Sequence, residues 1–314
     1  MTELMLKTVS RTQGNNQDLK DGSVQPRTFA FAFEEVDPLI AAFRRMVRGN
    51  EFDICEMAIT TYVCAKAFGK PMTAVPIFPV RAFHHGAILV DAKAGIRTPR
   101  DLEGRSVGVN RGYTVTTGVW ARGILQQEHG VDLSRITWVL SGDEHVAEYR
   151  PPPNVVPIAK DRNMAQMLAT GELAAAIGIE AGSAEVRPLI PDPLEAGLAA
   201  LRRNGHYPIN HTLVIRDELL AAHPDLAADV FAAFAEAKRR YVARLEAGQI
   251  EKPTQADQIH RRVMEITGDP LPYGIAPNRR MLDELIGHAL AQGIIERPVT
   301  AEQLFVPSTH ELVG

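Results

Sequence analysis

The chain has 314 residues, with 34 lysines and arginines against 38 aspartates and glutamates, which gives a formal net charge of −4. This length is about twice that of a usual domain, so we expect two lobes. The charge balance excludes nucleic-acid binding through an excess of positive charge, and no Lys/Arg-rich run indicates a polybasic membrane tether. Small carboxylate or phosphate ligands remain compatible with it.

The sequence shows no targeting segment, membrane span or disulfide framework. Residues Met1–Gln17 contain no uninterrupted apolar stretch of about seven to fifteen residues, as a secretory signal requires. No span approaches the roughly twenty apolar residues of a membrane helix, so we expect a cytoplasmic protein with no membrane partner. The two cysteines, Cys55 and Cys64, match no metal-ligand spacing, and we expect Cys55 to be a small buried hydrophobe.

The first ninety residues alternate short apolar strands with helices. Thr28–Glu34 has phenylalanine at every second position from residue 29, which is the period of a half-buried strand. Asp37-Pro38 combines a good N-cap with a proline suited to a first helical position, and predicts a helix that ends at Gly49. The other elements expected here are the strands Leu4–Val9, Phe52–Cys55, Thr73–Val80 and Gly86–Val90 and the helix Ala58–Phe68.

The same alternation continues after Val90. Thr98–Asp101 has the cap, proline and acidic third position of a helix start, and Arg111–Thr114 forms a turn into a helix that runs to about Glu128. Strands are also expected at Ser106–Asn110, Ile136–Leu140, Ala174–Ile179 and Tyr207–Ile215, and helices at Met164–Leu168, Pro224–Leu245, Ala256–Thr267 and Arg279–Gln292. This pattern predicts an α/β fold with mainly parallel sheets and helices on both faces.

Three segments resemble elements of type 2 periplasmic-binding proteins. Gly95–Val109 is similar to their entry into the second lobe, Met167–Ala176 to a later helix–glycine–strand element, and Val214–Leu220 to the return into the first lobe. The resemblance implies a two-lobed fold with a ligand cleft between the lobes. Residues 1–90 and 208–314 would then form a discontinuous first lobe, and residues 91–207 the second.

A closer resemblance covers nearly the whole chain. Phe52–Ala58, Phe78–Gly86 and Val109–Tyr113 resemble motifs of the 4,5-dihydroxyphthalate decarboxylase family. This resemblance implies a carboxy-lyase of phthalate degradation that converts 4,5-dihydroxyphthalate to protocatechuate. The alternatives are a cytoplasmic solute-binding protein of the same fold that captures a small organic anion without turnover, and a biosynthetic enzyme acting on another acid.

Decarboxylation of a dihydroxyphthalate places definite demands on a site. Each carboxylate of this substrate has a hydroxyl para to it, and protonation of the carboxyl-bearing ring carbon gives a cation-like intermediate that this hydroxyl stabilises by losing its proton. The site needs an acid for the ring carbon, an acceptor for the phenol and cations for the carboxylate that stays. By this logic no redox cofactor or electron sink is required.

The candidate proton-transfer residues are His84, His85, Glu56 and His211. Histidine gives or takes a proton near neutrality, and we expect only one of the adjacent pair His84 and His85 to face the substrate. Glu56 lies just past the carboxyl end of the strand Phe52–Cys55, and parallel sheets bind ligands at that end of their strands. It could equally be a charge at a helix start, where it interacts with the helix dipole. His211 lies near the expected return crossing, where a hinge hydrogen bond is the other interpretation.

The candidate substrate-binding residues are those that can hold an anion. A turn that contains glycine and leads into a helix favours anion binding, because the first backbone N–H groups of the helix are free to donate. An arginine guanidinium can form two parallel hydrogen bonds with a carboxylate. The residues are Arg81, Arg111, Tyr113, Thr116, Thr117, Thr60 and Thr61.

A divalent metal is an alternative role for some of the same residues. His84, His85, Glu56 and His145 would supply ligands that suit zinc or another transition metal, although the sequence does not show that they converge. A helix expected over Asp143–Glu148 would place His145 and Glu148 on one face, either at a site or as a surface ion pair. The helical C-terminal third has apolar faces that fit either a homo-oligomer or core packing.

Overall fold

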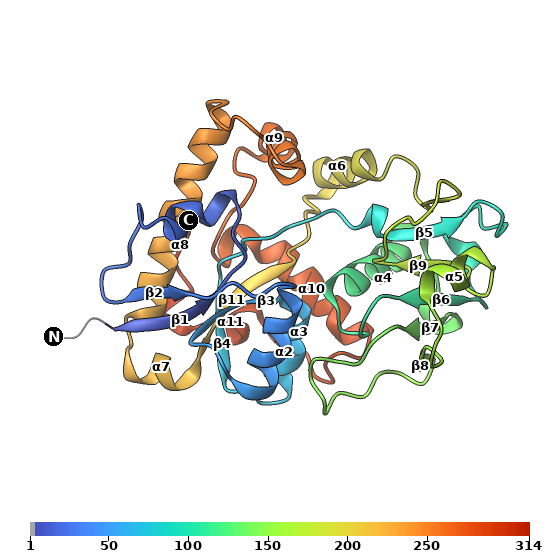
Figure 1. The fold of residues 1–314 in the computed structure, drawn as a ribbon, viewed down its shortest axis with the longest axis horizontal. Helices are drawn as coiled ribbons and strands as arrows, with labels where there is room; N and C mark the ends of the chain where they lie inside the picture. Colours follow the sequence, from blue (N-terminus) through green and yellow to red (C-terminus); the bar gives the residue numbers. More distant parts are fainter. Residues whose placement is uncertain (1–3) are drawn as a thin grey trace. The chain divides into compact units, whose positions relative to one another are not determined.

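Two β-sheets organise the chain, one in each of two units (Figure 1). The structure, a computed structural model, describes residues 4–314. The first unit contains the described residues up to Arg81 together with Ile209–Ile286 and Val299–Gly314, and the second contains Ala82–Pro208 and Gly287–Pro298. Residues 82–90, 208 and 287–298, which we expected in the first lobe, therefore fall in the second unit.

The sheet of the first unit is mixed. Its strands are β1 (Met5–Val9), β2 (Ala30–Phe33), β3 (Ile54–Ala58), β4 (Met72–Val75) and β11 (His211–Arg216). They lie in the order β2-β1-β3-β11-β4, with β1 parallel to β2 and β3, and with β11 antiparallel to β3 and β4. Every residue of β3 is buried, so both faces of this strand are covered, as is typical of α/β sheets.

The helices of the first unit include the predicted ones, with shifted ends. They are α1 (Gln17–Lys20), α2 (Ile40–Gly49), α3 (Ile59–Ala67), α7 (Asp217–Ala222), α8 (Leu226–Glu246), α9 (Gln255–Thr267), α10 (Arg279–Ala291, which continues into the second unit) and α11 (Ala301–Leu304). The short helices α1, α7 and α11 were not predicted. The predicted Asp37 cap is wrong, because Leu39 is the N-cap of α2, and Asn50 rather than a glycine takes the left-handed conformation at its end. The strand expected to run to Val80 ends at Val75, since prolines 76 and 79 cannot donate to a ladder.

The sheet of the second unit is also mixed. Its strands are β5 (Ile88–Asp91), β6 (Ser106–Val109), β7 (Thr137–Leu140), β8 (Val155–Pro157), β9 (Ala175–Ile177) and β10 (Val186–Pro188). They lie in the order β10-β5-β9-β6-β7-β8, in which β9, β6, β7 and β8 are parallel neighbours and β5 is antiparallel to β9 and β10. The helices are α4 (Thr116–His129), α5 (Met164–Ala169) and α6 (Pro193–Asn204). The predicted α/β class is thus confirmed.

One predicted helix of the second unit is wrong. Residues 143–148 form bends and a turn, with no helical residue. The physical reason lies in Glu144, whose carboxylate accepts hydrogen bonds from the backbone of Tyr113 and Thr114, some thirty residues earlier in the chain. These bonds hold the Glu144 side chain at the distant turn, so a tertiary contact and not local preference positions this segment. Among residues 4–314, no helix combines the length and apolar character needed to cross a membrane.

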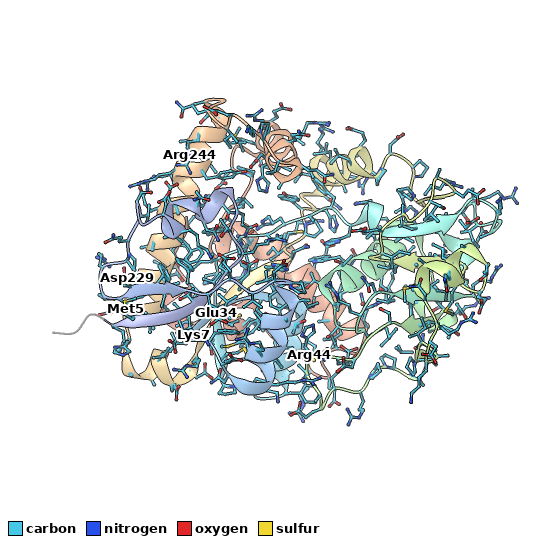
Figure 2. All side chains as sticks on the ribbon, in the orientation of Figure 1. Met5, Lys7, Glu34, Arg44, Asp229 and Arg244 are labelled. Atoms are coloured by element: carbon cyan, nitrogen blue, oxygen red, sulfur yellow. The ribbon has the colours of Figure 1, made fainter. Side chains whose placement is uncertain are left out.

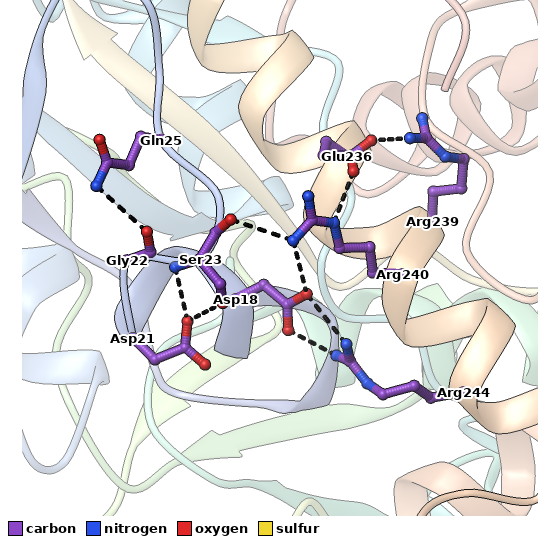
Figure 3. A network of polar contacts seen from close by, with 9 residues as sticks. All are labelled: Asp18, Asp21, Gly22, Ser23, Gln25, Glu236, Arg239, Arg240 and Arg244. Carbon is purple, nitrogen blue, oxygen red and sulfur yellow. Dashed lines mark hydrogen bonds and ion pairs between the residues drawn. The ribbon is translucent and has the colours of Figure 1, made fainter.

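The polar loop after β1 is tied to α8 by carboxylates (Figures 2 and 3). Asp18 accepts from both terminal nitrogens of Arg244, at 3.0 and 2.7 Å. Asp229 accepts from the backbone N–H groups of Arg27 and Thr28 and from the Thr28 hydroxyl, the last at 2.7 Å. These contacts hold the segment between β1 and β2 against α8. This segment starts at the carboxyl end of β1, next to the candidate site.

We predict that Asp229→Ala lowers the free energy of unfolding by about 1–3 kcal/mol, because two backbone N–H groups lose their acceptor. Urea unfolding of the variant and the wild type would measure it. Glu236→Ala is the matched control on the same helix, since its carboxylate pairs with the exposed Arg239 and Arg240 and such pairs contribute less than about 1 kcal/mol. Equal losses in the two variants would contradict the assigned role of Asp229.

Candidate active site

A buried carboxylate and a histidine meet between β3 and β11 in the first unit. Glu56 Oε1 lies 2.6 Å from His211 Nδ1. The antiparallel register sets His211 opposite Ala58 and Leu213 opposite Glu56, so the two side chains are diagonal neighbours on one face of the sheet. The Glu56 side chain is fully buried, whereas that of His211 keeps 17% of its surface exposed.

The second oxygen of Glu56 is held by the segment that follows β1. Ser10 Oγ donates to Glu56 Oε2 at 2.8 Å, and the backbone N–H of Arg11 donates at 3.0 Å. Asn16 Nδ2 in turn donates to Ser10 Oγ at 3.0 Å and to the Arg11 carbonyl at 2.9 Å. Both oxygens of the buried carboxylate therefore have donors.

These contacts determine the charge of Glu56 and the tautomer of His211. Desolvation raises the pKa of the Glu56 carboxyl, but the hydrogen bond and positive charge of His211 and the Ser10 hydroxyl outweigh it, so this pKa lies below its ordinary value. An ionised Glu56 can only accept, so His211 Nδ1 carries the proton. Nε2, which has no hydrogen-bond partner in the described part of the chain, is then the nitrogen able to exchange a proton. An edge-on contact with Phe43, with ring centroids 5.3 Å apart, packs against the imidazole.

Arg81 lies beside this pair. Its backbone bridges Ile209, and the carbonyl of the preceding Val80 accepts from the N–H of His211 at 3.2 Å. The guanidinium is buried, donates to Asn278 Oδ1 and lies 5.7 Å from the centre of the Phe78 ring. The predicted cation is therefore held within the same region of the first unit as Glu56 and His211.

Thr60 and Thr61 occupy the first turn of α3, directly after β3. Both are fully buried, and Thr61 Oγ1 has no hydrogen-bond partner among residues 4–314. They lie at the start of the helix that follows β3, at the carboxyl end of the strand, where α/β sheets bind ligands. Glu56, which we expected just after the strand, lies inside it, because β3 runs to Ala58.

The turn predicted to bind an anion already holds a carboxylate of the chain. In the second unit the backbone N–H groups of Tyr113 and Thr114 donate to Glu144, and Thr114 Oγ1 donates to Glu144 Oε2 at 2.7 Å. Gly112 allows this close approach, because a Cβ would come within 2.6 Å of Glu144 Oε2 and displace the carboxylate. Arg111 is exposed, with a left-handed φ of 72°.

A buried arginine supports the same turn from α4. Arg122 is fully buried, donates from Nη2 to the Tyr113 carbonyl at 2.6 Å and stacks 3.8 Å from the centre of the Tyr113 ring. Burial lowers the pKa of its guanidinium. Thr116 and Thr117 begin α4, the former buried and the latter half-buried. The sequence analysis missed Arg122, although a lone arginine in the apolar run Val119–Leu125 was a visible signal.

The adjacent histidines belong to the second unit. His85 is fully buried, and its Nε2 lies 3.2 Å from Glu128 Oε1. His84 is also buried. Hydrogen bonding with His85 holds the pKa of Glu128 below its ordinary value despite partial burial. His85 therefore pairs with Glu128, a partner that the sequence analysis did not identify.

The four residues considered as metal ligands do not form such a group. Glu56 pairs with His211 in the first unit, whereas His84, His85 and His145 are buried in the second. Across residues 4–314, no group of three or more His, Cys, Asp or Glu side chains is arranged to hold a metal ion.

The sequence analysis also missed Ser10, Asn16 and Glu144. The sequence did contain a pattern that points to Ser10. This residue follows the carboxyl end of β1, and Glu56 lies near the carboxyl end of the parallel neighbouring strand β3. Glu144 had none, since its partners lie some thirty residues away and no motif connects them.

The chain is similar to one curated protein over nearly its entire length and to another over about half of it. It is 32% identical over 328 residues to a 4,5-dihydroxyphthalate decarboxylase from Comamonas testosteroni, with 99% of each chain covered. A 4,5-dihydroxyphthalate decarboxylase from Pseudomonas putida is 36% identical over 179 residues, which cover 52% of this chain and 66% of that one. No family model matches the chain.

Solved structures show the fold. The periplasmic aliphatic sulphonate binding protein from Escherichia coli matches with a TM-score of 0.57 at 13% identity, over 97% of this chain and 92% of that one. A Candida albicans gene product described as having the generic periplasmic binding protein structural fold matches with a TM-score of 0.53 at 11% identity, over 100% and 99%. The predicted periplasmic-binding-protein-like fold is confirmed.

We predict that Glu56 makes stability depend on pH. Its folded-state pKa lies below the unfolded value of about 4.3, so the carboxylate stabilises the fold above that pH and this contribution is lost as pH falls through the folded pKa. The melting temperature of the wild type should therefore exceed that of Glu56→Gln at about pH 6–7, and the difference should shrink below about pH 4. Glu311→Gln, at an exposed position, is the matched control for loss of one carboxylate. A difference that stays constant with pH would contradict this prediction.

Proposed function

The chain belongs to the 4,5-dihydroxyphthalate decarboxylase family, and we propose that it removes one carboxylate of a hydroxylated aromatic dicarboxylate as carbon dioxide. The relatives favour 4,5-dihydroxyphthalate as the substrate and protocatechuate as the product. The observation that carries the proposal is the Glu56–His211 pair, which lies at the end of a sheet where α/β proteins bind ligands.

In the proposed mechanism His211 is the acid. Its Nδ1–H stays bonded to Glu56, and the protonated ring delivers a proton from Nε2 to the ring carbon that bears the leaving carboxylate. A π-electron pair of the ring forms the new C–H bond. The bond to the carboxylate then breaks, its electron pair restores the aromatic ring, and carbon dioxide leaves. One proton is consumed, and solvent returns it to Nε2.

Glu56 and Arg81 supply the charges that this step needs. Glu56 orients the imidazole and stabilises its protonated form, as a buried carboxylate does for a catalytic histidine. Arg81 would bind the carboxylate that stays on the ring through its guanidinium fork. Thr60 and Thr61 in the first unit, and Arg111, Tyr113, Thr116 and Thr117 in the second, remain candidates for further substrate contacts.

Proton transfer distinguishes this proposal from capture of an anion alone. A binding protein needs cations and hydroxyls, but it does not need a buried carboxylate holding a histidine in one tautomer. The step as written requires a proton donor and no electron-accepting cofactor. A divalent metal would instead polarise the catechol hydroxyls or a carboxylate, so the assay includes it.

The direct test is incubation of the purified protein with 4,5-dihydroxyphthalate, following carbon dioxide release and product identity, with and without added divalent metal. We expect stoichiometric carbon dioxide and protocatechuate. Tight binding without turnover under all conditions would overturn the enzyme proposal for this substrate and favour a binding protein.

We predict that His211→Asn lowers kcat by about 100-fold or more, since general acid catalysis contributes factors of that size. Dissociation constants for the substrate should change by only a few-fold, because Nε2 acts mainly in the transition state. His223→Asn, at an exposed position, is the control and should leave kcat unchanged. Retention of wild-type kcat by His211→Asn would remove His211 from the mechanism.

We predict that Arg81→Gln raises KM for the diacid by about tenfold or more, because a charge-assisted bond to a carboxylate is lost. Steady-state kinetics would measure it, with Arg45→Gln as the matched control. Arg45 pairs with Glu34 and Glu51 and so loses a guanidinium elsewhere in the first unit. Equal KM values in the two variants would show that Arg81 has a packing role only.

A further inference from the structure

The loop after β1 contains a buried polar atom that the proposed mechanism does not use. Asn15 is 2% exposed, and its Nδ2 donates to the Pro79 carbonyl at 2.8 Å. Its Oδ1 is buried and accepts no hydrogen bond within residues 4–314. A buried acceptor without a donor destabilises the folded state, so its presence calls for a physical explanation.

Hydrogen bonds connect Asn15 to the Glu56–His211 pair on two sides. Pro79, which accepts from Asn15, precedes Val80, whose carbonyl accepts from the His211 N–H at 3.2 Å. On the other side the next residue, Asn16, donates to Ser10 Oγ, and Ser10 donates to Glu56. Asn15 therefore belongs to the hydrogen-bonded group of residues that positions His211, the proposed acid.

The position of Asn15 relative to the sheet of the first unit also distinguishes it from another asparagine. Asn50 has a buried Oδ1 without a hydrogen-bond partner in the described chain as well. It follows α2 and precedes β3, so it lies toward the amino end of that strand, whereas Glu56 and the segment after β1 lie toward the carboxyl end. Ligands bind at the carboxyl end of such sheets.

We propose that Asn15 Oδ1 accepts a hydrogen bond from a phenolic hydroxyl of the substrate and so selects hydroxylated over unhydroxylated aromatic acids. This inference rests on the proposed function. Nδ2 donates to Pro79, and the buried atom left without a partner is the acceptor Oδ1, which suits an O–H donor. Asn15 would thus recognise the phenolic hydroxyl of the substrate, while Arg81 binds the carboxylate that stays on its ring.

The same contact would assist the chemical step. Protonation of the ring carbon draws electrons from the para hydroxyl and makes its proton more acidic. The bond from that hydroxyl to Asn15 Oδ1 then strengthens, so the contact stabilises the transition state more than the bound substrate. A loss of the acceptor should therefore lower kcat as well as the preference for hydroxylated ligands.

The test measures hydroxyl preference, defined as the dissociation constant for phthalate divided by that for 4,5-dihydroxyphthalate. Calorimetry in the His211→Asn background gives both constants with little turnover. Adding Asn15→Leu, which is nearly isosteric, should lower this ratio about tenfold or more while phthalate affinity changes by less than about threefold. In the otherwise wild-type protein, Asn15→Leu should also lower kcat.

Two further variants separate hydroxyl recognition from packing. Asn15→Asp keeps an acceptor and loses the same bond to Pro79 as leucine does, so its ratio should stay close to that of the parent although its charge weakens binding of both ligands. Asn50→Gly, which suits the left-handed φ of 48° at that position, should leave both the ratio and kcat unchanged. An unchanged ratio in Asn15→Leu would overturn the proposal and assign Oδ1 to a buried water.

A ligand-side measurement keeps the proposal testable if Asn15→Leu fails to fold. 4,5-Dimethoxyphthalate has no O–H donor, so the protein with Asn15 intact should bind it no better than phthalate. Binding as tight as that of the dihydroxy compound would overturn the role of Asn15. Absence of carbon dioxide release by the wild type would instead reject the proposed function, whereas the binding ratios would still decide the inference.

Discussion

A buried carboxylate that stays ionised is the constraint on which the arrangement of the first unit depends. Glu56 is fully buried in a strand covered on both faces, and an unpaired charge there would strongly destabilise the fold. Its two oxygens are satisfied by His211 from β11 and by the segment after β1. The strand β3, the strand β11 and the segment after β1 must therefore meet near the carboxyl end of β3. The hydrogen bond from His211 that helps stabilise the buried charge also fixes the tautomer of this histidine.

The glutamate–histidine pairs Glu56–His211 and Glu128–His85 differ in the exposure of their histidines. The His85 side chain, paired with the partly exposed Glu128 in the second unit, is fully buried, whereas the His211 side chain, paired with Glu56 in the first, retains exposed surface. An acid must exchange its proton with the substrate and then with solvent, so the exposed surface of the His211 side chain favours His211 over His85. The carboxylate partner alone does not identify the acid, because both histidines have one.

The anion-binding turn of the second unit illustrates how the same local chemistry can serve the fold. Free amides after a glycine attract a carboxylate, as the sequence indicated, but the carboxylate present is Glu144 of the chain itself. Arg122, buried beneath the turn, adds positive charge to this environment and binds the Tyr113 carbonyl. The pattern Arg-Gly-Tyr-Thr predicted an anion at this turn, and the carboxylate that the structure shows there is that of Glu144.

The sequence by itself determined the α/β class and most of the longer strands and helices, because hydrophobic period, caps and proline positions act over a few residues. It did not indicate the short strands β8 and β10 or the helix α6. It predicted α4, α8 and α9 closely and misjudged residues 143–148, where bonds to a distant turn override local preference. Only the tertiary structure decided that Glu56 meets His211, 155 positions away, and that His85 meets Glu128. Such pairings follow from strand register and from the antiparallel return of β11, which no local pattern encodes.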